Sequence, residues 1–204
     1  MTAEVRSQDM QPLNSLMSVK RISREASFAS GPEEAVWVLT RALPSMVGPQ
    51  DQADQQGKAA LRSAATVFML TPDKRYHLIT APVNFPPEQY HEKIAVDLGH
   101  PAHISQTRHP LLLRHTGHHD SFVKILQSFR AGSAMFAPLM WGHEYLGVLI
   151  CANAEPGTFT ELDLVFHETC ANMAASLWMA HDGPQWMTTL DYDSLPERTY
   201  PATS

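Results

Sequence analysis

The sequence predicts an α+β fold: a central antiparallel sheet with the N- and C-terminal helices on one face and a mixed segment of loops and short elements over the other. Two pairs of strand-like segments are each joined by a short turn, and helix-periodic segments precede the first pair and follow the second. The last strand-like segment, residues 145–151, is almost continuously apolar, which is typical of a strand that is covered on both faces.

The N-terminal quarter of the chain is predicted to be helical. Residues 13–28 carry apolar side chains at spacings of three or four, which indicates an amphipathic helix. Ser30-Gly-Pro-Glu33 has the form of a capping box and is expected to open a second helix. Pro44 and the Gly-Pro pair after it predict the end of that helix.

Short strands and loops are predicted for the middle of the chain. Residues 64–70 and 76–81 are strand-like, and the Pro72-Asp-Lys-Arg75 turn signal between them predicts a hairpin. Four shorter elements are expected after it: a strand at 94–98, a helix at 101–107, a strand at 111–113 and a helix at 120–129.

Residues 133–181 have the clearest pattern. Two apolar strands flank a turn at Gly142, and Thr160-Glu-Leu-Asp163 resembles a capping box with Asp in the usual Glu position. Apolar residues at helical spacing follow as far as His181.

The domain organisation predicted from these elements has three parts. Residues 1–12 form a flexible N-terminus, and residues 13–181 form a single domain. Residues 182–204 contain three prolines and no periodicity, so they are expected to be an extended tail that leaves the domain. The aromatic and leucine side chains of this tail could pack on their own domain or on a partner subunit.

Composition narrows the class of protein. The apolar content of 44% is ample for a core, and the net charge of −6 gives no sign of a nucleic-acid partner. The N-terminus lacks a signal-peptide pattern, and no apolar run reaches the roughly 20 residues that span a membrane. Cys151 and Cys170 fall on core positions, which favours a reducing compartment. A cytoplasmic protein without membrane contact is expected.

The block 133–181 resembles the C-terminal half of a GAF domain. The shared features are the strand with Ala137-Pro138-Leu139, the glycine turn, the strand with Leu146-Gly147-Val148-Leu149, the loop 157–160 and the closing helix. This resemblance implies a stand-alone GAF protein with the profilin-like or PAS-like sheet. It also implies a ligand pocket between that sheet and the segments that correspond to Gly99–Asp120.

Gly99–Asp120 is rich in histidine and arginine, so it is the predicted ligand site. The planar guanidinium of arginine can donate two parallel hydrogen bonds to a carboxylate or phosphate, which suggests a small organic anion as the ligand. The candidate ligand-binding residues are His100, His103, Arg108, His109, Arg114 and Asp120.

Part of the same segment could instead bind a metal ion. His115, His118 and His119 carry imidazoles that suit Zn²⁺ or another first-row ion, although their spacing matches no strong signature. A haem would need one axial histidine, which His100 or His103 could supply, as could His109. The sequence leaves the cofactor open.

Three known GAF activities are disfavoured by particular residues. Asn153, Phe159 and Asp163 match the cyclic-nucleotide motif, but Ala154 and Leu164 replace its lysine and final glutamate. Asn153 is then expected to close the turn and Asp163 to cap the helix. Bilin attachment fails because no cysteine lies between 84 and 130. Methionine-sulfoxide reduction needs exposed thiols, which the two core-like cysteines do not offer.

Three functions remain open at this point. The first is a sensory or regulatory module that binds a small molecule and acts through a homodimer of the terminal helices, 13–28 and 160–181, or through a separate effector protein. The second is an enzyme or enzyme subunit that uses the histidine-rich segment 99–120, with or without a metal. The third is an assembly subunit whose C-terminal tail wraps a partner.

Overall fold

A six-stranded antiparallel sheet forms the centre of the protein, with the strand order β3-β2-β1-β6-β5-β4. The computed structural model describes residues 16–48, 62–119 and 123–198. The strands are β1 (Ser63–Leu70), β2 (Tyr76–Val83), β3 (Lys93–Ala95), β4 (Leu111–Leu113), β5 (Ser133–Trp141) and β6 (Glu144–Asn153). Both predicted hairpins are therefore confirmed.

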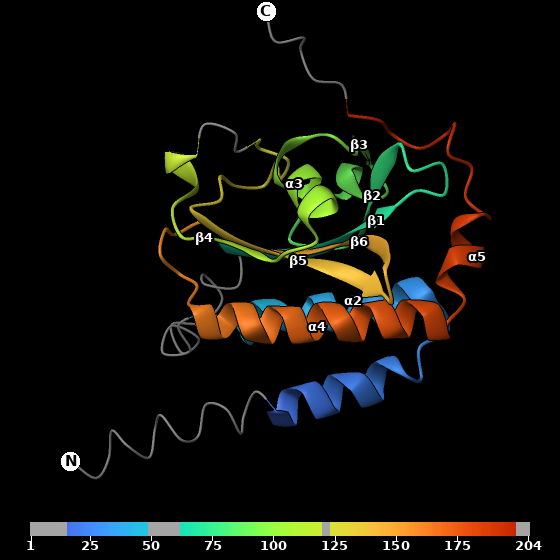
Figure 1. Ribbon diagram of the computed structural model, residues 1–204, viewed down its shortest axis with the longest axis horizontal. Coiled ribbons are helices and arrows are strands. Elements are labelled where there is room, and N and C mark those ends of the chain that lie inside the picture. The colour runs from blue at the N-terminus through green and yellow to red at the C-terminus, as the bar shows by residue number, and fades with distance from the viewer. Residues whose placement is uncertain (1–15, 49–61, 120–122, 199–204) are drawn as a thin grey trace, which may run out of the picture.

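Helices cover the two faces of this sheet unequally (Figure 1). The long helix α4 and helix α2 lie on one face, here called the helix face, and helix α3 lies on the other, here called the loop face. A further helix, residues 16–26, packs outside the layer of α2 and α4. The helices with printed bounds are α2 (Pro32–Ala42), α3 (Gly99–Thr107), α4 (Glu161–Ala180) and α5 (Gly183–Met187), with short 3₁₀ turns at Leu43–Ser45, Pro87–Gln89 and Thr116–His118.

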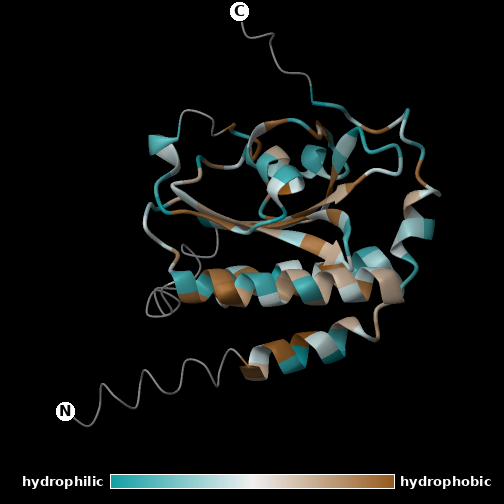
Figure 2. Cartoon of the chain, in the orientation of Figure 1, coloured by the Kyte–Doolittle hydropathy of each residue, from teal (hydrophilic) through white to brown (hydrophobic). Residues whose placement is uncertain are grey.

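Both faces of the central strands are buried, which explains their continuous apolar sequence. Successive side chains of a strand point to opposite faces. On β6, Leu149 and Cys151 belong to the cluster under α2 and α4, whereas Val148 and Ile150 belong to the cluster of the loop face. Figure 2 shows apolar residues along these strands. The prediction that this segment is covered on both faces is confirmed.

Helix α4 begins at the predicted capping box. The backbone N–H of Asp163 donates to the Thr160 hydroxyl at 3.2 Å, and the N–H of Thr160 donates to the Asp163 carboxylate at 2.8 Å. The same carboxylate also accepts the N–H of Gly48 at 2.9 Å, so it ties α4 to the chain that follows α2. The Ser30 box is different: Ser30 donates to the carboxylate of Glu34, not Glu33.

Two predicted segments have a different structure. Residues 123–129 are irregular, so the predicted helix at 120–129 is wrong there, and its first three residues lie outside the described ones. The expected extended tail instead turns back. α5 packs on α4, where a Cβ on Gly183 would lie 2.2 Å from the Trp178 ring, so only glycine permits this approach. Residues 196–198 then reach β3.

Among the described helices, none is both long and apolar enough to cross a membrane. This statement concerns only the described part of the chain.

Two histidines, His77 and His167, are completely buried inside this fold. His167 on α4 donates its Nε2–H to the Leu149 carbonyl at 3.0 Å, and burial lowers its pKa to about 4. His77 on β2 lies 2.9 Å from the Tyr145 hydroxyl. Burial, with a smaller effect of the Arg108 charge, lowers the pKa of His77 to about 4. Neither Nδ1 atom has a hydrogen-bond partner among the described residues.

We expect the free energy of unfolding to decrease as the pH falls from 7 to 4. In this window an unfolded histidine binds a proton near pH 6.5, whereas His77 and His167 stay neutral in the folded state, so acid favours unfolding. The effect is roughly 3 kcal/mol per histidine at its full extent. Urea unfolding at pH 7 and pH 4.5 measures it. His167→Gln, which cannot titrate, should lose part of the decrease, and an unchanged decrease would contradict burial as its cause.

Candidate functional site

A cavity of about 50 Å³ lies between the loop face of the sheet and the segments that cover it. β1, β5 and β6 form its floor. The start of α3 and the irregular segment 123–131, here called the roof, close it from the other side. The cavity is thus on the side of the sheet where the sequence predicted a pocket.

A row of alanines explains why there is space at this place. Ala64 on β1 and Ala134 on β5 are both register partners of Ala152 on β6, so three small side chains lie next to one another across three strands. All three line the cavity. The next row on the same face contains Ile150 and Phe136, which are much larger. The floor is therefore deepest over the alanines.

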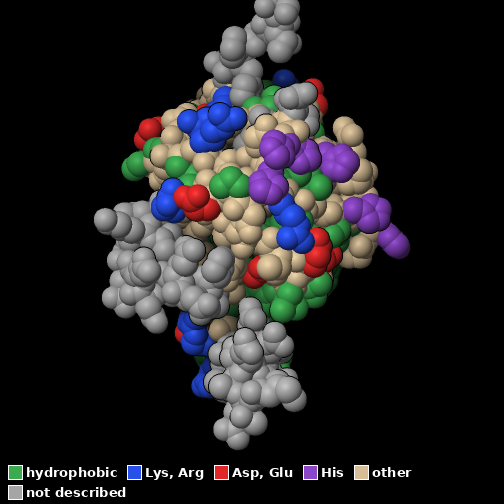
Figure 3. Space-filling model, turned by 90° about the vertical axis from the view of Figure 1, so that its left-hand side faces the viewer, with side chains coloured by type: hydrophobic (Ala, Val, Ile, Leu, Met, Phe, Trp, Pro, Cys, Tyr) green, Lys and Arg blue, Asp and Glu red, His purple; other side chains and the backbone are tan. Residues whose placement is uncertain are grey.

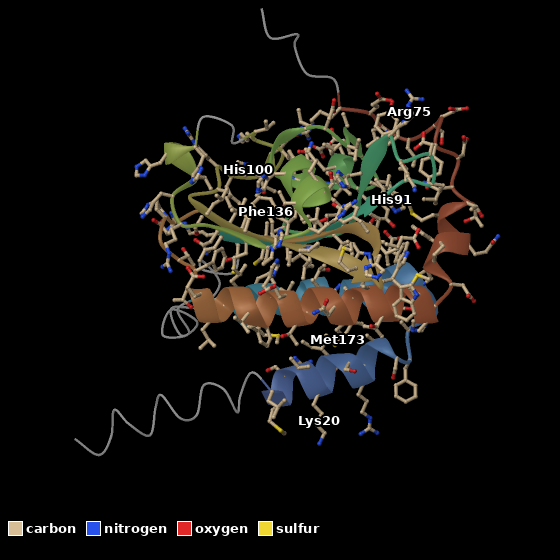
Figure 4. The ribbon with its side chains drawn as sticks, in the orientation of Figure 1. Lys20, Arg75, His91, His100, Phe136 and Met173 are labelled. Carbon is tan, nitrogen blue, oxygen red and sulfur yellow. The ribbon has the colours of Figure 1, made fainter. Side chains whose placement is uncertain are left out.

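His100 supplies the imidazole in the cavity wall. It lies in the first turn of α3, and its ring stacks on Phe136 with a centroid distance of 5.7 Å (Figure 4). Burial, followed by the neighbouring His119 and His103, lowers the pKa of His100 below its usual value of 6.5. His100 is therefore uncharged at neutral pH, and a neutral imidazole can donate one hydrogen bond and accept another.

The roof is held by polar side chains outside the cavity. Ile125 points its side chain into the cavity, and its backbone carbonyl accepts a hydrogen bond from Gln89 at 2.9 Å. The amide oxygen of Gln89 accepts the backbone N–H of Gln127 at 2.9 Å. Gln89 is completely buried, so its amide group must find hydrogen-bond partners inside the protein. Both the nitrogen and the oxygen of the amide bind the roof.

The family model described as the GAF domain matches residues 35–177, which is more than half of the chain. The chain belongs to the GAF family. This confirms the resemblance seen in the closing block. A search of curated proteins finds no match.

Solved GAF domains have the same fold. The GAF domain of a phosphoenolpyruvate-protein phosphotransferase from Coxiella burnetii matches with a TM-score of 0.70 and 16% identity, over 85% of this chain and 97% of that one. The free methionine-R-sulfoxide reductase of Neisseria meningitidis, solved with its substrate, matches with a TM-score of 0.64 and 11% identity, over 83% and 91%. At these identities the likeness establishes the fold alone.

Of the five predicted ligand residues that the structure describes, only one lines the cavity of this GAF domain. His100 lines the cavity, whereas His103 on α3 and His109 after α3 are exposed and do not line it. Arg108 lies over the Tyr145 ring, with its guanidinium carbon 4.2 Å from the ring centroid. The sixth predicted residue, Asp120, lies outside the described residues.

Arg114, the remaining predicted residue, faces the helix layer. Its guanidinium donates to the carboxylate of Glu161 at 3.1 Å, and a second nitrogen is 3.5 Å from the Phe159 carbonyl. The structure therefore does not bring the two predicted arginines together around one ligand.

The three histidines of the predicted metal site also separate into two contacts. The rings of His115 and His118 stack with a centroid distance of 5.3 Å, while the ring of His119 meets His100 edge-on at 6.0 Å. Figure 3, which views the molecule from the left-hand side of Figure 1, shows histidines gathered on that side. In the described residues, no group of three or more His, Cys, Asp or Glu side chains is arranged to hold a metal ion.

The remnant of the cyclic-nucleotide motif has structural roles. The amide oxygen of Asn153 accepts the N–H of Glu155 at 2.7 Å and the hydroxyl of Thr158 at 3.2 Å, so Asn153 closes the turn after β6. Asp163 caps α4. Phe159 is buried in the core on the helix face. The roles expected for Asn153 and Asp163 are confirmed.

Both cysteines are free and buried in the core of the helix face. Burial raises the pKa of Cys151, and the nearby Asp163 and Cys170 raise it further. Burial raises the pKa of Cys170 to about 12. Because a thiolate is the reactive form, neither side chain is suited to be a nucleophile.

We expect neither cysteine to react with a disulfide reagent such as Ellman's reagent at pH 8 in the native protein. Both should react after unfolding in urea, at rates higher by at least about a hundredfold, since burial suppresses both the thiolate and access. His143→Cys, at the exposed turn between β5 and β6, is a positive control that should react at once. Rapid modification of Cys151 in the folded protein would show that its burial is wrong.

Proposed function

We propose that this GAF domain is a sensory or regulatory module that binds a small, neutral, mostly apolar molecule in the cavity over Ala64, Ala134 and Ala152. The observation that carries the proposal is the composition of the cavity wall: apolar and aromatic side chains, one hydroxyl from Thr66 and one imidazole from His100. Ligand sites are typically concave and apolar, with a few polar groups that fix orientation.

The charge of the wall argues for a neutral ligand. Within the described chain, no Lys, Arg, Asp or Glu lines the cavity. A carboxylate placed there would lose its hydration without a charged partner, which is costly. Arg108 and Arg114, which the sequence offered as anion-binding groups, are engaged with Tyr145 and Glu161. The organic anion expected from the sequence therefore has less support than a neutral molecule with one polar group.

The enzyme alternative has less support than binding. It depended on the segment 99–120, whose histidines lie mostly on the surface and do not converge with a carboxylate among the described residues. A free methionine-R-sulfoxide reductase of this fold would suggest thiol chemistry. Both cysteines of this chain are buried and protonated, so they do not support it. Binding requires only the cavity.

The pair benzyl alcohol and benzoate tests the ligand class, because the two differ in charge but hardly in size. We expect benzyl alcohol to bind at least about tenfold more tightly than benzoate, since only benzoate must bury an ionised carboxylate. NMR titration at neutral pH measures both affinities. The largest shifts should fall on the amides of β6 near Ala152 and of α3 near His100.

Ala152→Leu fills the cavity and should abolish binding of benzyl alcohol. Overpacking beside Ala64 and Ala134 should lower the free energy of unfolding by about 1–3 kcal/mol, so the NMR spectrum of the variant is used to check that it is folded. The matched control is Ala154→Leu, two residues further on, where the side chain lies in the open groove beside His115. That variant should bind like the wild type. Tighter binding of benzoate, or equal loss in both variants, would contradict the proposal.

We also propose a second copy of the chain as the means of signal output, in line with the terminal helices expected to pair. Helix 16–26 buries Ile22 and Ala26 and leaves Leu16 and Met17 exposed by 65% and 55%. At the start of α4, Leu162 and Val165 are exposed in the same way, by 57% and 58%. Figure 1 shows that both helices begin on the same side of the molecule. A separate effector protein is the alternative occupant of this face.

Exchange of Leu162 and Val165 for glutamine tests the dimer. Large apolar anchors at a subunit contact commonly contribute more than 1 kcal/mol each, so the double variant should weaken dimerisation about tenfold or more. Light scattering during size-exclusion chromatography measures it over a range of concentrations. His103→Gln, exposed on α3 on the opposite face of the sheet, is the control and should leave the dimer intact. A monomeric wild type at all concentrations would refute the dimer.

A further inference from the structure

The C-terminal segment 192–198, here called the strap, lies along the edge of the sheet at β3. The backbone N–H of Lys93 donates to the Pro196 carbonyl at 2.7 Å, and the N–H of Arg198 donates to the Lys93 carbonyl at 3.0 Å. Lys93 and Glu197 are partners in a parallel bridge. The strap thus covers a sheet edge that would otherwise expose unpaired backbone groups.

Arg198 connects the strap at the sheet edge to the roof of the cavity. Its Nε and Nη2 donate to the two carboxylate oxygens of Glu92 at 2.8 and 2.6 Å, and both side chains are about 90% buried, with exposed fractions of 9% and 11%. Its third nitrogen, Nη1, donates to the Ile125 carbonyl at 2.7 Å. A buried bidentate pair of this kind has fixed geometry.

The strap and the roof belong to one buried polar network. The carbonyl of Ile125 accepts from both Arg198 and Gln89, and Gln89 also donates to Glu92 at 3.1 Å. Gln127 completes the network through its backbone N–H. Removal of Arg198 would leave Glu92 buried without its charged partner, so docking of the strap and attachment of the roof depend on each other.

The roof is the part of the cavity wall that can yield to a ligand. The floor strands β1, β5 and β6 are each paired on both sides, and α3 is a regular helix. An apolar cavity that binds benzene has a volume of about 150 Å³, whereas this cavity has about 50 Å³. A ligand of the size of a single aromatic ring must therefore displace Ile125 and the rest of the roof outward.

We propose that the strap regulates the cavity: while Arg198 is docked it holds the roof closed, and its release lets the roof move and admits an aromatic-sized ligand. The coupling is reciprocal, so a ligand that pushes Ile125 outward also loosens the strap and delivers a signal to the C-terminal end of the chain. This inference rests on the proposed function for the identity of the site. The attachment of the roof itself can be measured without any ligand.

Hydrogen exchange of the Gln127 amide is the first readout, because its N–H is bound only when the roof is attached through Gln89. In Arg198→Gln we expect this amide to exchange at least about tenfold faster than in the wild type. The control is Glu197→Gln, which weakens the exposed contacts of the strap to Tyr76 and Lys93 but keeps Arg198 on Glu92. That variant should stay within about twofold of the wild type.

The affinity for benzyl alcohol is the second readout. A site that opens only rarely binds with an apparent affinity reduced by its open fraction, so Arg198→Gln should bind benzyl alcohol about tenfold more tightly than the wild type. Glu197→Gln should again behave like the wild type.

A disulfide between positions 93 and 197 tests the same coupling with Arg198 in place, in case Arg198→Gln does not fold. Lys93→Cys combined with Glu197→Cys puts two cysteines at bridge partners, whose Cα separation suits a disulfide. The oxidised form should exchange Gln127 more slowly and bind benzyl alcohol more weakly than the same protein after reduction. This comparison uses one polypeptide in two redox states, so the substitutions themselves cancel.

The outcomes separate the two proposals. The proposal that the strap regulates the cavity is overturned if the Gln127 amide exchanges at equal rates in the oxidised and reduced double-cysteine protein. Equal rates in folded Arg198→Gln and the wild type would overturn it as well. Failure of benzyl alcohol to bind any variant, while Gln127 exchange responds as expected, overturns the proposed function and leaves the strap established. Response of both readouts supports both.

Discussion

The burial of β6 on both faces is the constraint on which the structure depends. β6 pairs with β1 and β5 along nearly its whole length, and its side chains point alternately into two separate cores. Each face must therefore be covered. α2 and α4 cover one face with apolar side chains such as Leu39, Ala174 and Trp178, but the loop face has only a short helix and irregular segments. The cavity lies under the irregular segment, over the row of alanines.

The fold could be predicted because its signals are local. The capping box at Thr160 and the continuous apolar run of β6 are each contained in a short stretch of sequence, and both have the expected structure. The floor of the cavity could not be predicted in this way. Ala64, Ala134 and Ala152 are ordinary alanines in sequence and form a row only through the register of three strands. The alanine at the second position of β1, at the second position of β5 and at the last but one position of β6 is the signal that a strand alignment could have used.

The predictions that proved wrong on the loop face and in the C-terminal segment failed for physical reasons. Ile125 and Leu126 have the spacing of a helix face, but the same spacing serves an irregular segment that points both side chains into a cavity. The arginines of 99–120 are the right type for an anion, yet distant residues such as Glu161 engage them. The C-terminal segment has no periodicity over its length because only the short helix α5 is regular. Apolar side chains such as Met187 and Leu195 pack on the helix-face core, and residues 196–198 are held by backbone groups and by Arg198.

The position of Arg198 in the chain also sets the order in which the protein is completed during synthesis. Its two partners, Glu92 and Ile125, lie 106 and 73 positions earlier. A chain that grows from its N-terminus makes the residues of all six strands and of α4 before it makes Arg198. Attachment of the roof through Arg198 is therefore possible only after the rest of the cavity wall has been synthesised.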